Sequence, residues 1–75
     1  MQSHKNIPRH THLNQRVADA DLVAMIHKEA AHTSALTDDK REMHIAEVES
    51  AIANKCAGYK IKPDSYFTYY MAMIE

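Results

Sequence analysis

The chain has 75 residues, of which 45% are hydrophobic and 25% charged, and its formal net charge is −1. This length allows one domain at most, and the composition is that of a globular domain and not of a disordered or fibrous chain. One cysteine excludes an intramolecular disulfide, and one glycine with two prolines favours helices over tight hairpins.

Residues 1–14 show no hydrophobic periodicity and contain Pro8, so we expect an extended arm before the first helix. The first sixteen residues hold no acidic residue, and their basic residues are Lys5, Arg9 and Arg16. The sequence therefore predicts a basic N-terminal arm, which packs loosely through Ile7 and Leu13.

Residues 15–33 have the pattern of an amphipathic helix. At 100° per residue, one face collects Leu22, Val23, Ile26, Ala30 and Thr33. Asp21, Lys28 and His32 fall on the opposite face. The apolar face predicts packing against a second helix.

The polar break after residue 33 ends at Thr37, which we expect to cap a second helix over residues 38–57. Its apolar positions recur at intervals of three and four, at Ile45, Val48, Ile52, Cys56 and Tyr59. A second stripe holds the small residues Ala46, Ala53 and Ala57. Gly58 is expected in the left-handed conformation that ends many helices. The short connection predicts that the two helices form an antiparallel hairpin.

A third helix is predicted over residues 64–74, because Pro63 and Asp64 can begin a helix. The alternative is a β-hairpin that pairs residues 59–62 with residues 66–71 around a Pro-Asp turn. We favour the helix, since an isolated two-stranded hairpin is only marginally stable. The sequence thus predicts one all-α domain over residues 1–75, a small three-helix domain built on an antiparallel helical hairpin.

No residue pattern indicates a metal site, a cofactor or a catalytic centre. The histidines have no four-residue spacing, which would place two ligands on one helical face, so we predict no metal site. Cys56 lies near the end of a predicted helix, where nothing lowers the pKa of its thiol, and we expect a buried thiol. The protein is therefore expected not to be an enzyme.

The predicted third helix has an apolar arc about 200° wide, although packing on one hairpin needs little more than 100°. We assign Phe67, Met71 and Ile74 to the core. The remaining residues Tyr66, Tyr69 and Met73 are predicted to form a homodimer or target interface, because exposed tyrosine and methionine are typical of binding surfaces. The alternative is that the N-terminal arm covers them.

The acidic residues Asp38, Glu42 and Glu49 fall close together on the helical wheel, beside the apolar stripe of the second helix. They indicate either a solvated flank or the acidic rim of a protein interface. We include them among the predicted partner-binding residues.

The sequence favours a non-catalytic protein-binding module that docks on or blocks a larger protein, in the manner of a phage- or plasmid-type accessory inhibitor of a host complex. The alternative is a small nucleic-acid-associated regulator that uses Lys5, Arg9 and Arg16. Direct DNA recognition is disfavoured, because acidic residues dilute the basic ones of the second helix. Without an apolar span or secretory signal, we expect a cytoplasmic protein with no membrane contact.

Overall fold

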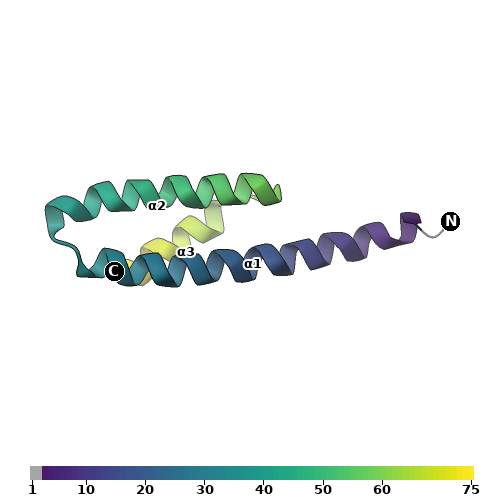
Figure 1. Ribbon diagram of the computed structural model, residues 1–75, viewed down its shortest axis with the longest axis horizontal. Coiled ribbons are helices and arrows are strands. Elements are labelled where there is room, and N and C mark those ends of the chain that lie inside the picture. Colours follow the sequence, from purple (N-terminus) through teal and green to yellow (C-terminus); the bar gives the residue numbers. More distant parts are fainter. Residues whose placement is uncertain (1–2) are drawn as a thin grey trace.

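The computed structural model describes the backbone of residues 3–75 and the side chains of residues 15–75. It contains three α-helices, α1 (Ser3–Ala35), α2 (Asp38–Tyr59) and α3 (Asp64–Ile74), which are seen in Figure 1. No strand occurs within residues 3–75. The predicted all-α class is confirmed, and the alternative β-hairpin around residue 63 is wrong. No helix in this part of the chain is long and apolar enough to span a membrane.

The bounds of α1 include residues 3–14, so the helix starts earlier than the predicted residue 15. Periodic apolar positions mark only the part of a helix that packs on a neighbour, and they give no bound beyond it. The side chains of residues 1–14 lie outside the described part of the chain. The predicted packing of the N-terminal arm through Ile7 and Leu13 therefore stays a prediction.

Helices α1 and α2 lie side by side in opposite directions and are joined by Leu36 and Thr37, as Figure 1 shows. This arrangement is the predicted hairpin. Helix α3 runs in the same direction as α1 and opposite to α2, and it ends near the connection between the first two helices (Figure 1). It packs mainly against α1 and has much less contact with α2.

Helix α2 begins at Asp38 with Thr37 as its N-cap residue, as predicted, but the threonine hydroxyl forms no capping hydrogen bond with the backbone. Its carbonyl accepts the backbone N–H groups of Lys40 and Arg41 at 3.1 and 2.8 Å. The hydroxyl instead donates to the Asp39 carboxylate over 2.7 Å. This hydrogen bond, with backbone N–H groups at residues 39 and 40, lowers the pKa of Asp39.

The end of α2 differs from the prediction, because Lys60 and not Gly58 adopts the left-handed conformation, with φ of 61°. The N–H of Lys60 donates to the Ala57 carbonyl at 3.1 Å, and that of Ile61 donates to the Cys56 carbonyl at 3.0 Å. These two bonds form a Schellman motif, in which the residue after the left-handed one packs back on the helix. Ile61 does pack against the core, which explains why the helix continues past its glycine.

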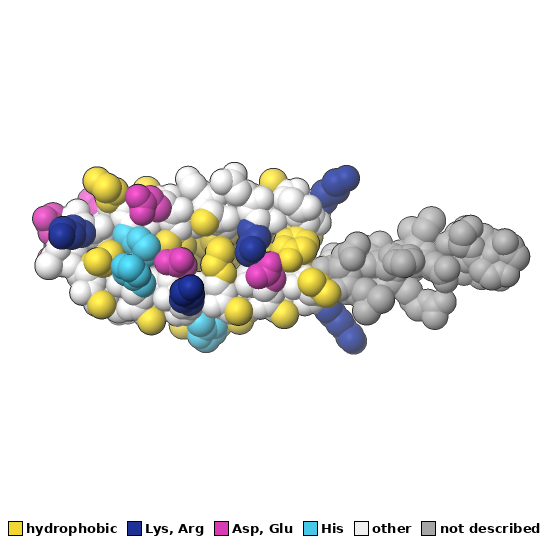
Figure 2. Space-filling model, viewed as in Figure 1, with side chains coloured by type: hydrophobic (Ala, Val, Ile, Leu, Met, Phe, Trp, Pro, Cys, Tyr) yellow, Lys and Arg dark blue, Asp and Glu magenta, His cyan; other side chains and the backbone are white. Residues whose placement is uncertain are grey.

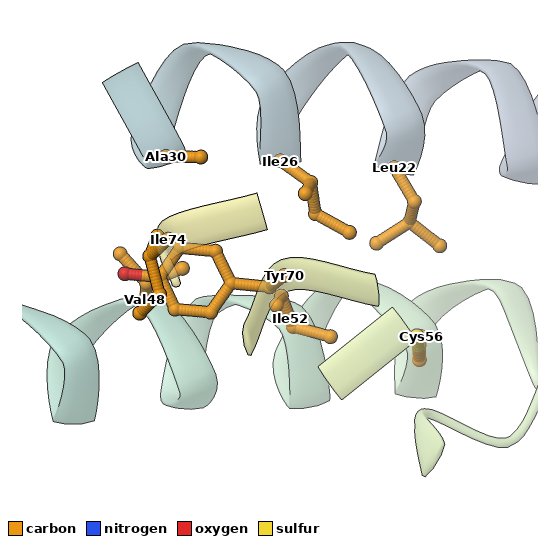
Figure 3. Packing of buried hydrophobic residues seen from close by; sticks show 8 residues of the cluster. All are labelled: Leu22, Ile26, Ala30, Val48, Ile52, Cys56, Tyr70 and Ile74. Atoms are coloured by element: carbon orange, nitrogen blue, oxygen red, sulfur yellow. The ribbon is translucent and has the colours of Figure 1, made fainter. Parts of the chain in front are cut away.

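The core collects buried side chains from all three helices (Figure 3): Leu22, Ile26, Ala30, Val48, Ile52, Cys56, Tyr70 and Ile74. The predicted faces of α1 and α2 are confirmed, except that Val23, Ile45 and Tyr59 are only partly buried. In α3 the prediction was incomplete. Phe67 and Met71 are partly buried against the core, whereas Tyr70, which was not assigned to it, is fully buried.

Tyr70 is buried together with its hydrogen-bond partner. The hydroxyl of Thr33 donates to the Glu29 carbonyl over 2.7 Å. That bond uses the single hydroxyl proton of Thr33, so the Tyr70 hydroxyl, 2.7 Å away, donates to the Thr33 oxygen. A tyrosine hydroxyl is protonated at neutral pH, and burial raises the pKa of Tyr70 further, so this group is available as a donor.

The hydrogen bond between the two buried hydroxyls predicts the relative stabilities of the variants in a double-mutant cycle. Thr33→Val leaves the Tyr70 hydroxyl buried without its acceptor and should cost about 1–3 kcal/mol of unfolding free energy. Tyr70→Phe leaves the bond from Thr33 to Glu29 in place and should cost less, about 0.5–1.5 kcal/mol. The double variant should be more stable than Thr33→Val alone, as measured by urea unfolding. Additive losses in the two single variants would contradict the proposed bond.

The conformations of Gly58 and Lys60 at the end of α2 indicate two substitutions that should stabilise the fold. A Cβ added at helical Gly58 would meet no atom within 4 Å, so Gly58→Ala should raise the unfolding free energy by about 0.5–1 kcal/mol. Lys60→Gly should also stabilise, because glycine adopts the left-handed conformation without steric cost. Thermal melts of both single variants test this. A lower melting temperature for Gly58→Ala would show that Gly58 is not helical.

Candidate functional site

Helix α3 and the neighbouring side of α1 form a surface that we call the α1/α3 face, defined by Asp19, Val23, His27, Tyr66, Tyr69 and Met73. The hydroxyl of Tyr66 donates to the Asp19 carboxylate over 2.9 Å. The hydroxyl of Tyr69 lies 2.7 Å from Nε2 of His27. Both tyrosine side chains of this face are therefore tied to α1 at their hydroxyl ends.

The α1/α3 face combines exposed apolar groups with a shallow hollow. Tyr69 and Met73 are each 38% exposed, whereas Tyr66 is partly buried against the core. Asp19, Val23, Ser65, Tyr66 and Tyr69 line an open hollow of about 350 Å³. The three residues predicted from the sequence as an interface thus lie on one flank of α3, and two of them line a concave surface.

The predicted acidic residues lie on α2 and do not join the α1/α3 face. Asp38 and Glu42 are exposed, and Glu49 is partly buried. No described contact connects these three acidic residues with Tyr66, Tyr69 or Met73, so the structure does not bring the two predicted sets together.

A second hollow, of about 370 Å³, lies on another side of α3 at Phe67, Met71 and neighbouring residues.

We call the line of contact between α1 and α2 the seam; Asp21, Glu29 and His32 line it from α1, and His44, Lys55 and Tyr59 from α2. Figure 2 shows the side of the molecule on which the seam lies, with α3 behind it. Toward one end of this seam, the Asp21 carboxylate accepts a hydrogen bond of 2.6 Å from the Tyr59 hydroxyl. The Lys55 ammonium lies 3.1 Å from the same oxygen. The Tyr59 hydroxyl, followed by Lys55, lowers the pKa of Asp21, and the same bond raises the pKa of Tyr59. These contacts join the two helices.

Further along the seam, α1 and α2 bring together Glu29, His32 and His44, whose ligand atoms all lie within 4.8 Å of one another. The two imidazole rings stack with centroids 4.6 Å apart. Figure 2 shows two histidine side chains together there, with an acidic side chain beside them. Histidine spacing within single helices does not reveal this cluster, because His32 and His44 meet through the packing of α1 on α2.

The residues of the nucleic-acid alternative are only partly described. Arg16 is exposed on α1, and Lys5 and Arg9 lie outside the described side chains. The prediction of a basic nucleic-acid-binding arm therefore stays untested.

Comparison with known proteins adds no relative: no family model, curated protein or solved structure matches this chain.

Asp21 predicts a defined pH dependence. Because its pKa is lowered in the folded state, it stabilises the fold above the ordinary aspartate value of about 4, and this contribution is lost as the pH falls through the folded-state pKa. Asp21→Asn should therefore lower the melting temperature at pH 7 and lose less stability than the unsubstituted chain between pH 5 and roughly pH 2. Asp38→Asn, at an exposed residue with no described partner, is the control. Equal acid sensitivity of the Asp21→Asn variant and the unsubstituted chain would contradict the assignment.

Proposed function

We propose that the chain is a non-catalytic protein-binding module that docks on a larger protein through the α1/α3 face. The observation that carries the proposal is the exposure of Tyr69 and Met73 beside a hollow lined partly by Tyr66. Tyrosine is enriched among the residues that dominate binding energy, and methionine adapts to imperfectly matched surfaces. The three residues thus supply the side-chain types that protein interfaces use.

The hydrogen bonds of the two tyrosines support this role. Tyr66 is held by Asp19 and Tyr69 by His27, so their rings have a fixed position before any partner arrives. A side chain that is already ordered loses less conformational entropy on binding, and more of its contact energy appears as affinity. The α1/α3 face is therefore suited to rigid docking.

The charge at the hollow indicates the chemistry of the partner. Among the described side chains, those that line the hollow include the carboxylate of Asp19 and no lysine or arginine. An apolar segment flanked by lysine or arginine would complement this surface. Docking of this kind would act by steric blocking, as in a phage- or plasmid-encoded inhibitor of a host complex.

The test replaces the exposed pair with charge. Tyr69→Glu/Met73→Glu should keep the helical circular dichroism spectrum and lower the melting temperature by only a few degrees, because both side chains are 38% exposed and the hydrogen bond lost between Tyr69 and His27 is a solvent-exposed one. It should reduce capture of the partner from a lysate of the source organism by roughly tenfold or more, since charge would be placed in an apolar contact. Capture is quantified by mass spectrometry.

The matched control is Ser50→Glu/Asn54→Glu, which places two glutamates at the same spacing on exposed positions of α2. It should retain capture. Light scattering separates the remaining alternatives: dimers that dissociate in the Tyr69/Met73 variant would identify a second copy as the partner. A folded Tyr69/Met73 variant with undiminished capture and association would overturn the proposal.

A further inference from the structure

The Glu29, His32 and His44 cluster brings together three residues of two ligand types that transition metals use, carboxylate and imidazole, from two helices. Glu29 and His32 are three residues apart on α1, and His44 approaches them from α2. Residues three apart on a helix lie on the same face, so both α1 side chains point toward the seam that His44 enters. Two imidazoles and one carboxylate form the ligand set of many catalytic zinc sites.

His44 contains a nitrogen that the fold leaves without a hydrogen bond. Its Nε2 atom is buried, and no described residue forms a hydrogen bond with it. The nearest carboxylate oxygen, Oε1 of Glu29, is 3.2 Å away but outside hydrogen-bonding geometry. A buried polar atom without a hydrogen bond costs free energy. A metal ion between Nε2 and Oε1 would satisfy both atoms.

We propose that Glu29, His32 and His44 form a binding site for a divalent transition metal, with Zn²⁺ as the expected ion. Two ligand atoms of a tetrahedral zinc ion are about 3.4 Å apart, given metal–ligand distances of roughly 2.1 Å. The observed separations, up to 4.8 Å, therefore require a small approach of the side chains. His32 is exposed, so its ring can leave the stacked position on His44 and turn toward the other two ligands. Water would complete the coordination.

Glu47 is assigned as a positioning residue for this site. Its Oε1 atom lies 3.7 Å from Nδ1 of His44, the ring nitrogen that faces away from Glu29. Histidine ligands commonly donate their second N–H to a carboxylate, which fixes the tautomer and orients the metal-binding nitrogen. At 3.7 Å the two atoms are too far apart for a hydrogen bond, so a small approach of the exposed Glu47 side chain would let it accept the N–H of Nδ1 and direct Nε2 of His44 toward the ion without touching the ion.

The ligand types also determine which ions the site rejects. Mg²⁺ and Ca²⁺ prefer six or more oxygen ligands, and this cluster provides one carboxylate and two imidazoles. Zn²⁺ accepts nitrogen and oxygen ligands with low coordination number. MgCl₂ is therefore the appropriate negative control for ZnCl₂.

The test measures ZnCl₂ binding to the chelator-treated full chain by isothermal titration calorimetry. We expect one zinc ion per chain with a dissociation constant in the micromolar range or below. Zinc at roughly 100 times the dissociation constant should raise the melting temperature by roughly 10–20 °C, because the ion binds the folded state and joins α1 to α2. MgCl₂ at the same concentration should leave the melting temperature unchanged.

Three variants locate the ion. His32→Gln removes an exposed ligand, so the variant should fold normally while its zinc affinity falls by roughly tenfold or more. Glu29→Gln should do the same. Glu47→Gln should weaken zinc binding by about tenfold while one ion per chain still binds, the pattern expected of a positioning residue.

Matched controls exclude other histidines. His27→Gln alters the one remaining described histidine, and His4→Gln/His10→Gln/His12→Gln removes those near the N-terminus. Both controls should bind zinc with the affinity of the unsubstituted chain. The proposal is overturned if no zinc binds, if His32→Gln binds zinc as tightly as the unsubstituted chain, or if the N-terminal triple variant alone loses binding.

Discussion

The hydrogen bond between the buried hydroxyls of Tyr70 and Thr33 determines where α3 lies. Helix α3 has 11 residues, and an isolated helix of that length is unstable in water, so it depends on packing against the hairpin. Apolar packing alone tolerates sliding, but a buried hydroxyl must meet its acceptor. Thr33 is the one buried polar side chain within residues 15–75, so it is the one buried side chain that can accept the Tyr70 hydroxyl. This bond therefore selects one placement of α3 among those that would bury similar apolar area.

The other contacts of α3 agree with that placement. Tyr66 reaches Asp19 and Tyr69 reaches His27, both on α1, while Arg41 of α2 donates to the Ile74 carbonyl at the last turn of α3. A cation at this end of a helix also compensates the partial negative charge of its carbonyl groups. Within residues 3–75, no helix covers the opposite side of the hairpin, where polar contacts at Asp21 and at Glu29 join α1 and α2. The two sides of this small domain thus differ in chemistry: an aromatic face beside α3 and a polar seam between α1 and α2.

The sequence was sufficient for the helices and for most of the core, because apolar spacing and chain breaks are local properties. It was insufficient where three-dimensional packing decides. The arc of α3 contained Tyr70, but nothing in its periodicity indicated that Thr33 would be available to accept its hydroxyl. Gly58 looked like the end of α2, yet the contact of Ile61 with the core placed the left-handed residue two positions later, at Lys60. His32 and His44 are twelve positions apart on different helices, which no spacing rule within a helix can detect.

Glu29 contributes to both the core and the seam, through different atoms. Its main-chain carbonyl accepts the Thr33 hydroxyl inside the core, and its carboxylate lies in the seam beside His44. Any amino acid in the helix provides the carbonyl, so folding places little demand on which side chain occupies position 29. The contacts that depend on the side chain at position 29 are therefore those in the seam. A substitution of Glu29 should change the seam beside His44 and leave the hydrogen bond from the Thr33 hydroxyl to the main-chain carbonyl of residue 29 in place.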